Sequence, residues 1–468
     1  MNENPGTLVP ELLLLGAAVL GLLLGAWLPR HRQWLVRLLA ALSAAAGLVA
    51  TAVAATRPAE VVFGTSYAVD TLTSATRAVV LVAVLVALAL SVDGTRGHRR
   101  ETEFVVLLQL GALGTVLLGG ANDLLLLFAA FLLAGVPLYA LAGWDKSARG
   151  VEGAMKYYLS GAFLGVTMLA GTALLLGVGR STAYAALRDG LASAPAAAVA
   201  VGTVALLAGL LFKIGAVPAH FWVPDVTDGT PPAVAAVVTT IPKIGGLVAG
   251  YRLLHVAIPA AGPDWPLLVA VLAAASMTLG NLAAFFQTSV QRLLAYSTIS
   301  QVGYLLMAVA VAGRAALAQP ALLFYLAGYV VTNLGAFAVV AALPGARTLD
   351  DHRGLGRSRP ALAAALAVCL FGLVGTPPTA VFVGKLTVFT AAVDGGFAWL
   401  AVLAIVNTVA SVFYYLRWLA PAFRRDGGVD VPRAPWAAAV AYGCAAGAVL
   451  LGVVGGTVLP LLAGGPAS

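Results

Sequence analysis

The sequence predicts an all-α polytopic membrane protein of about fourteen transmembrane helices. Of its 468 residues, 61% are hydrophobic and only 10% are charged, whereas soluble domains carry about 45–50% apolar and about 25% charged residues. Apolar runs recur along the whole length, and many reach the roughly 20 residues that a helix needs to cross about 30 Å of hydrocarbon. We therefore expect a lipid bilayer around most of the surface.

Charged residues and clusters of Pro and Gly divide these runs into fourteen candidate spans. The first run lacks a preceding basic region and an obvious cleavage site, so we interpret it as a retained helix. The third span is short, and the twelfth is too long for one straight crossing. The approximate ranges are 8–28, 34–54, 77–92, 104–120, 122–142, 155–178, 196–216, 232–253, 266–286, 292–312, 320–342, 361–392, 397–419 and 436–462.

Basic residues near the ends of the spans predict the orientation. With the four lysines near or within spans set aside, 23 basic residues remain, and 17 of them lie after odd-numbered spans. Because cytoplasmic loops carry the excess of Arg and Lys, the odd-numbered loops are expected inside and both termini outside. The chain is thus expected to be a multi-pass protein of the cell inner (plasma) membrane.

The composition excludes several other classes of protein. The net charge of +8 is explained by the arginines of these loops, so we expect no nucleic-acid partner. The two cysteines, Cys369 and Cys444, are too few for a disulfide framework, a zinc site or an iron–sulfur cluster. No metal or cofactor site is expected within this chain.

Four of the five lysines stand inside or at the edge of apolar spans. An ammonium at this depth costs several kcal/mol unless it faces protein, water or a counter-charge, which makes such residues candidates for function. A buried lysine can lose its proton, whereas arginine stays charged, so lysine suits a proton relay. The candidates are Lys156, Lys213, Lys243 and Lys385.

Two of the predicted helices are expected to be broken at membrane depth. Gly215, Pro218 and Pro224 interrupt the seventh span, and the Gly-Thr-Pro-Pro run at 375–378 interrupts the twelfth. His220 follows Lys213 by seven residues across the first break. Two breaks five spans apart, each near a lysine, indicate an internal repeat of five helices with an ion site near the midplane.

The acidic residues near these segments have simpler interpretations. Glu152 precedes Lys156 by four residues, the favourable order for an ion pair on one helix face. Asp123 is expected to cap the fifth span, and Asp225 and Asp228 to bound the loop after the seventh.

Several motifs resemble subunit N of the bacterial NADH:quinone oxidoreductase, respiratory complex I. The likeness covers roughly residues 100–425 and is specific. The matching runs are LFKIGAVPAHFWVPDV at 211–226, GTPPAV at 229–234, PK at 242–243, QTSVQRLLAYSTISQVGY at 287–304, YVVTNLGAF at 329–337, DHRGLGR at 351–357 and GLVGTPPTAVFVGK at 372–385.

This resemblance implies an antiporter-like subunit that couples quinone reduction in partner subunits to proton transfer. It implies three N-terminal helices in 1–100, two inverted five-helix repeats in 101–255 and 256–425, and a last helix in 426–468. Its partners would be the other membrane subunits of the complex, which would hold or connect to the quinone, flavin and iron–sulfur centres. By motif, the proton path would contain Lys213 as central lysine, Lys243 as connecting lysine, Lys385 in the outward half-channel, His220, and Lys156.

One position departs from the family pattern. The family carries a glutamate on the fifth helix five residues before the position of Pro137, and this chain has Leu132 there. That carboxylate is the expected partner of the central lysine. Without it, burial would act on the Lys213 ammonium unopposed unless another acid substitutes.

Two further functions are compatible with these observations. A subunit of a multi-subunit cation/proton antiporter would share the fold and the lysines, although the motifs at 221–225 and 242–243 favour subunit N. A structural membrane-arm subunit that has lost pumping would explain Leu132 but not the retained lysines. Any oxidoreductase activity would belong to the assembly, since the chain has no flavin, iron–sulfur or nucleotide motif.

The arginine distribution predicts which ends of the chain an impermeant thiol reagent reaches in intact cells. A cysteine introduced by Ser468→Cys should be labelled, because the C-terminus is expected outside. One introduced by Thr348→Cys should be protected, because the 345–360 loop is expected inside. The reverse labelling pattern would overturn the orientation.

Overall fold

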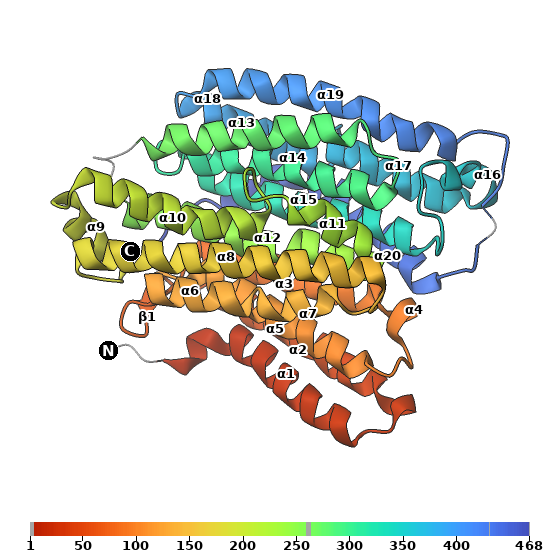
Figure 1. The fold of residues 1–468 in the computed structure, drawn as a ribbon, viewed down its shortest axis with the longest axis horizontal. Helices are drawn as coiled ribbons and strands as arrows, with labels where there is room; N and C mark the ends of the chain where they lie inside the picture. Colours follow the sequence, from red (N-terminus) through yellow and green to blue (C-terminus); the bar gives the residue numbers. More distant parts are fainter. Residues whose placement is uncertain (1–3, 259–263, 430, 468) are drawn as a thin grey trace.

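The computed structural model describes residues 4–258, 264–429 and 431–467 as a bundle of helices with one short hairpin (Figure 1). Within this part of the chain, thirteen helices are long and apolar enough to cross a membrane, and Pro360–Val374 is a shorter apolar helix. The expected all-α membrane fold is confirmed. The twelfth span is too long for one crossing because it consists of two helices, α17 (Pro360–Val374) and α18 (Ala380–Asp394), separated by a break.

The elements follow one another along the chain as follows: η1 (Pro5–Leu8), α1 (Val9–Trp27), η2 (Arg30–Arg32), α2 (Trp34–Ala54), β1 (Glu60–Val62), β2 (Tyr67–Val69), α3 (Thr71–Leu90), α4 (Val92–Thr95), α5 (Glu101–Gly120), α6 (Leu124–Leu133), α7 (Val136–Ala142), α8 (Ala148–Gly179), α9 (Tyr184–Ala192), α10 (Ala196–Ile214), α11 (Trp222–Gly229), α12 (Pro232–Arg252), η3 (Leu253–Ala257), α13 (Trp265–Ala284), α14 (Val290–Ala310), α15 (Ala318–Ala341), η4 (Asp350–His352), α16 (Leu355–Ser358), α17 (Pro360–Val374), α18 (Ala380–Asp394), α19 (Ala398–Ala422), α20 (Pro435–Val453) and α21 (Gly455–Leu461).

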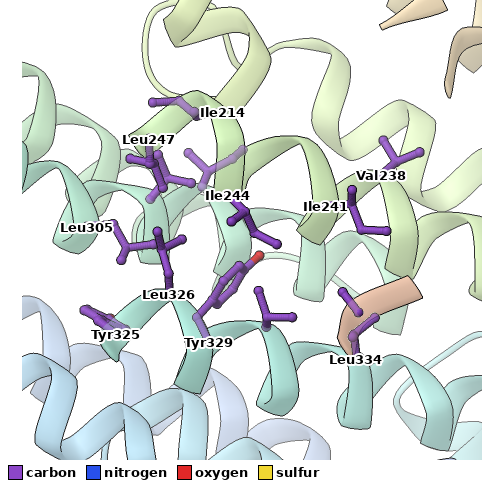
Figure 2. Close-up of a cluster of buried hydrophobic side chains, with 14 of the residues drawn as sticks. Ile214, Val238, Ile241, Ile244, Leu247, Leu305, Tyr325, Leu326, Tyr329 and Leu334 are labelled. Carbon is purple, nitrogen blue, oxygen red and sulfur yellow. The ribbon is translucent and has the colours of Figure 1, made fainter. Parts of the chain in front are cut away.

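The centre of the bundle consists of α12, α14 and α15. In the most apolar stretch of each of these helices, 89–94% of residues are buried, against 33% for α1. Figure 2 shows α12 facing α15 across branched aliphatic side chains, with the Tyr329 ring between the two helices. Helices that are apolar all round and enclosed by protein carry few charges, so the polar residues found there need a specific explanation.

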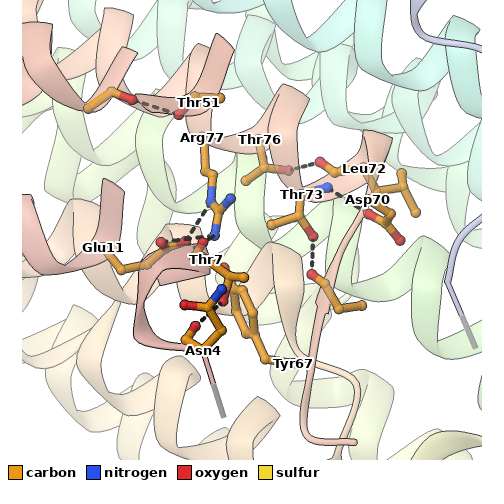
Figure 3. Close-up of polar contacts among 12 residues, drawn as sticks. Asn4, Thr7, Glu11, Thr51, Tyr67, Asp70, Leu72, Thr73, Thr76 and Arg77 are labelled. Atoms are coloured by element: carbon orange, nitrogen blue, oxygen red, sulfur yellow. Dashed lines mark hydrogen bonds and ion pairs between the residues drawn. The ribbon is translucent and has the colours of Figure 1, made fainter. Parts of the chain in front are cut away.

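Buried ion pairs join the N-terminal helices. Arg77 of α3 donates to both Glu11 carboxylate oxygens, at 2.7 and 2.9 Å, and Tyr67 donates to Glu11 at 2.7 Å (Figure 3). Arg37 of α2 pairs with Glu101 of α5 at 3.0 Å. The sequence-based start of the third span at 77 was wrong, because Arg77 is a buried residue of a helix that begins at Thr71.

A second buried pair connects α3 to the end of α12. The Arg252 guanidinium donates two hydrogen bonds to the Asp70 carboxylate, at 2.7 and 2.8 Å, and both side chains are buried. Asp70 also caps α3 through the Thr73 amide and accepts from the amide of Ala467. Burial alone would raise the pKa of the Asp70 carboxyl, but the Arg252 charge holds it below its usual value.

The loops after odd-numbered spans gather at one end of the molecule. The loops near Asp93, Trp144, Thr230, Arg347 and Arg433 line one cavity there. Both termini lie at the opposite end of the bundle, away from α4 and α16 (Figure 1). This arrangement agrees with the predicted alternation of the spans, and the assignment of the two ends to the two sides of the membrane stays a prediction.

Removing one partner of the Asp70–Arg252 pair should destabilise the fold more than removing both. Arg252→Leu leaves a buried carboxylate without its cation, which costs about 3–5 kcal/mol, and Asp70 is only 5% exposed. Adding Asp70→Asn should recover part of that loss in thermal unfolding of the detergent-solubilised protein. Equal stability of Arg252→Leu and wild type would contradict this reading of the pair.

The same pair makes stability depend on pH in a defined direction. Because the folded-state pKa of Asp70 is lowered, its contribution is present above the ordinary carboxyl value of about 3.9 and is lost as pH falls through the folded-state pKa. The acid-induced loss should therefore be smaller in the Asp70→Asn, Arg252→Leu double variant.

Candidate functional site

The first predicted helix break lies between α10 and α11. α10 ends at Ile214, Gly215 has a φ of +72°, and α11 begins only at Trp222. A left-handed glycine ends a helix without steric cost, and Pro218 has no amide to continue it. The Gly215 and Ala216 amides still donate to the Phe212 and Leu211 oxygens, whereas the Ile214 oxygen at the very end of α10 has no backbone amide partner among the described residues.

Side chains from α11 and α12 donate hydrogen bonds to carbonyl groups at this end of α10. The Trp222 indole donates to the Phe212 oxygen at 3.1 Å. The Lys243 Nζ, from the fully buried middle of α12, donates to the Ile214 oxygen at 2.5 Å and lies 5.9 Å from the Trp222 ring centroid. Lys243 therefore satisfies the end of a broken helix.

The second predicted break, between α17 and α18, is satisfied in the same way. α17 ends at Val374, and Gly375 has a φ of +89°. The Lys385 Nζ of α18 donates to the Val374 oxygen at 2.8 Å, and Gln301 of α14 donates to the Leu373 oxygen at 2.7 Å. A buried lysine again donates a hydrogen bond to the last carbonyl of the helix before the break.

A third break, which the sequence analysis missed, separates α6 from α7. The amide of Gly135 turns to the Leu132 oxygen, and Pro137 has no amide to offer. The Phe131 oxygen accepts instead from the Lys213 Nζ at 2.9 Å, and the ammonium lies 4.2 Å from the Phe131 ring centroid. The signal was available in the Gly-Val-Pro run at 135–137, on the fifth span.

No carboxylate replaces the expected glutamate. Among the described residues, no ion pair involves Lys213, Lys243 or Lys385. Leu132 is 43% exposed on the outer surface, whereas the preceding residue contacts Lys213. The carbonyl and the ring of Phe131 therefore hold the ammonium of Lys213.

Polar side chains of the motif regions lie between α12 and α15. Asn333 donates to the Thr239 hydroxyl at 3.1 Å, one turn before Lys243. Tyr329 donates to the Thr239 carbonyl at 2.8 Å and lies 3.2 Å from the Thr298 hydroxyl. Figure 2 shows the Tyr329 hydroxyl directed at α12. The run YVVTNLGAF at 329–337 thus contributes two polar side chains to the contact between α12 and α15.

A further set of polar groups adjoins Lys385. Its Nζ lies 3.3 Å from the Thr408 hydroxyl, which in turn lies 3.3 Å from the Tyr304 hydroxyl. The Tyr304 ring centroid is 4.1 Å from the ammonium. Tyr325 donates at 2.6 Å to Gln301, the residue that satisfies the neighbouring carbonyl. Hydroxyl and amide groups thus continue from the α12–α15 contact toward α18.

The remaining two predicted site residues lie in different surroundings. His220, within the first break, is mostly buried, and its Nδ1 has no hydrogen-bond partner among the described residues. Lys156 of α8 is 46% exposed and pairs with Glu152, as predicted, and with Asp225, each at 2.7 Å. Asp225 also pairs with Arg292 at 2.8 Å. Lys156 is therefore part of a surface ion network, away from the three buried lysines.

A cavity of about 750 Å³ opens at the end of the bundle where the odd-numbered loops meet. Its wall includes Asp93, Arg149, Gln291 and the hydroxyl of Thr230, a mostly buried group without a partner in the described part of the chain. No group of three or more potential metal ligands occurs among residues 4–258, 264–429 and 431–467.

The family model described as NADH:quinone oxidoreductase/Mrp antiporter, TM, matches residues 121–411. A relative from Streptomyces griseus, NADH-quinone oxidoreductase subunit N 1, is 63% identical over 465 residues, which cover 99% of this chain and 98% of the relative.

Two solved structures extend these findings. One chain of respiratory complex I from Thermus thermophilus is 35% identical, with a TM-score of 0.85 and coverage of 97% of this chain and 100% of that one. A chain of the Mrp complex from Dietzia is 22% identical, with a TM-score of 0.85 and coverage of 98% and 96%. The second likeness shows the fold alone.

The close packing at the first break predicts that a methyl group added at Gly215 is poorly tolerated. In Gly215→Ala, the new Cβ would lie 2.7 Å from Val223 and 2.9 Å from the Lys243 Nζ, at a positive φ. We expect a loss of stability of about 1–3 kcal/mol from crowding, with displacement of the Lys243 ammonium. The loss of stability is measured by thermal unfolding and by the abundance of the protein in membranes.

Gly443→Ala provides the matched control, because no atom lies within 4 Å of a Cβ at residue 443 in α20. Alanine is the better helix former there by up to about 1 kcal/mol, so this variant should be neutral or stabilising. Equal effects of the two substitutions would contradict a specific contact at Gly215.

Proposed function

Because the chain belongs to the NADH:quinone oxidoreductase/Mrp antiporter family, among its NADH-quinone oxidoreductase subunit N members, we propose that it moves protons through its buried lysines. One observation carries the proposal: Lys213, Lys243 and Lys385 are each enclosed by protein and each lie at a helix break without a carboxylate partner. A group that only caps a helix need not be ionisable, so three lysines in this role favour proton transfer.

The proposed path runs from Lys213 to Lys243 and on to Lys385. Glycine at 246 lets the two first lysines approach, since a Cβ there would lie 3.3 Å from the stem of Lys213. Beyond Lys243, the hydroxyl and amide groups of Thr239, Asn333 and Tyr329 offer donors and acceptors toward α15. Water between such groups would complete the connection, as in other polar interiors.

The bond of each lysine to a carbonyl suits proton transfer. An ammonium has three donors and a neutral amine keeps N–H groups of its own, so the carbonyl stays satisfied in both protonation states. The helix end therefore does not open when the proton leaves. The lysine can therefore keep its hydrogen bond to the helix end whether or not its amine is charged.

His220 and Lys156 are proposed to act at the edges of this path. His220 has a buried, unpartnered ring nitrogen beside the first break. Lys156 is proposed to tune the path from outside, because its ion network lies on a surface that also exposes large apolar side chains, including Met155 and Leu159. A neighbouring subunit would cover such a surface.

We propose that the chain works within the membrane arm of a complex I assembly in the plasma membrane. The named relatives are subunits of NADH-quinone oxidoreductase and respiratory complex I, which supports other subunits of that complex as partners. The quinone, flavin and iron–sulfur centres would belong to those partners. Breaks in the seventh and twelfth spans support two inverted repeats, in 101–255 and 256–425, between three N-terminal helices and one C-terminal helix.

Lys213→Met should impair coupled proton uptake by membrane vesicles during NADH oxidation, while the assembled complex stays abundant. The substitution removes the titrating amine and keeps an unbranched apolar stem of similar length. A loss of most of the proton uptake is expected. Normal uptake at normal abundance would favour the alternative of a structural subunit without pumping.

Lys146→Met is the matched control, because Lys146 is the one lysine predicted outside the spans and its side chain is exposed between α7 and α8. It should leave both uptake and abundance unchanged. Sodium-dependent exchange without NADH oxidation would instead support the cation/proton antiporter.

A further inference from the structure

The three buried lysines share one kind of surrounding. Each ammonium donates to a backbone carbonyl at a helix break, and those of Lys213 and Lys385 also lie against an aromatic ring. The Phe131 ring centroid is 4.2 Å from the Lys213 nitrogen, and the Tyr304 centroid is 4.1 Å from the Lys385 nitrogen. The Lys243 nitrogen is farther from its ring, 5.9 Å from the Trp222 centroid. The two short distances lie well within the range of a cation–π contact.

Both parts of this surrounding favour the charged amine without carrying a full charge. The free carbonyls at a helix C-terminus form the negative end of the helix dipole. An aromatic face attracts a cation through its quadrupole, and the attraction strengthens where water is excluded. Lys213 and Lys385 are buried, so both effects act at close to full strength.

We propose that Phe131 is a positioning residue for Lys213, with its carbonyl and ring replacing the missing carboxylate, and that Tyr304 plays the same part for Lys385. This inference rests on the proposed function, since it concerns how these lysines hold their protons. Phe131 acts through Lys213 and does not itself exchange a proton.

A neutral surrounding changes what happens when the proton leaves. If a buried carboxylate were the partner, deprotonation of the lysine would leave an unpaired buried anion, which is costly. A carbonyl and a ring leave no such charge. The proton of Lys213 can therefore move on without separating an ion pair.

The other titratable groups around Lys213 are also uncharged hydroxyls or a second lysine. A Cβ at Gly135 would lie 2.8 Å from both the Lys213 Nζ and the Tyr139 hydroxyl of α7. Tyr157 of α8 stacks on Trp222 of α11 and contacts Tyr139. From α12, a Cβ at Gly246, three residues after Lys243, would lie 3.3 Å from the Lys213 stem. A change confined to the Phe131 ring therefore tests its contact with the Lys213 ammonium and leaves these other groups as they are.

The test replaces Phe131 by phenylalanines with one, two and three ring fluorines in the assembled complex. Each fluorine weakens the negative face of the ring and almost preserves its shape, so folding should be maintained. The alkaline limb of the pH profile of proton uptake should move stepwise to lower pH, by up to about one pH unit in total. A profile that does not move across the series would overturn the inference.

Phe128 supplies the control, since it stacks on Phe131 at 6.5 Å on the same helix, whereas the ring beside the Lys213 ammonium is that of Phe131. The same series at 128 should leave the profile in place. An equal shift at 128 would show a general effect of fluorine and contradict a specific role for Phe131.

Lys213→Met separates this inference from the proposed function. If Lys213→Met pumps normally, the proposed function fails. If it is impaired while the fluorinated series leaves the profile unchanged, only the positioning role of Phe131 fails. Tyr304→Phe, which keeps the ring and loses the hydroxyl, should shift the profile less than Tyr304→Leu. The opposite order would assign the effect to the hydroxyl and overturn the role of the Tyr304 ring.

Discussion

The arrangement of this protein depends on how a helix can end inside a membrane. Backbone groups that leave a helix in hydrocarbon have no water to bond, and each unsatisfied group costs several kcal/mol. α10 and α17 end in the interior, at Ile214 and Val374, and α6 ends beside Lys213. Lysines from elsewhere in the bundle donate to the freed carbonyls. Each donor lowers the cost of a break, and each break gives a buried lysine an acceptor.

That mutual dependence also explains the burial at the centre. α12 carries Lys243 and is nearly fully enclosed by its neighbours, above all α3, α5, α10 and α15. The Asp70–Arg252 pair joins the start of α3 to this core, and the Glu11–Arg77 pair joins α1 to α3. The ion pairs thus belong to the scaffold, whereas the lysines have neutral surroundings.

Much of this could be predicted from the sequence, because lipid imposes simple rules. Span number, the two Gly/Pro breaks and the buried lysines all follow from composition and spacing. The break after α6 escaped prediction because one proline within a Leu-rich run does not reveal where the carbonyls point. The ion pair at Arg77 escaped for a different reason: the partner, Glu11, is 66 residues away, and spacing within one helix carries no record of contacts between helices.

The contacts of the Asp70 carboxylate form in a fixed order during synthesis of the chain. It caps α3 early in the chain, yet its guanidinium partner is 182 residues further on and the amide of Ala467 is 397 residues further on. A ribosome that has released α3 into the bilayer has not yet synthesised either group. During that interval the carboxylate must remain hydrated at the membrane surface or be protonated. The contacts of Asp70 with Arg252 and with the amide of Ala467 can therefore form only after those later segments have been synthesised.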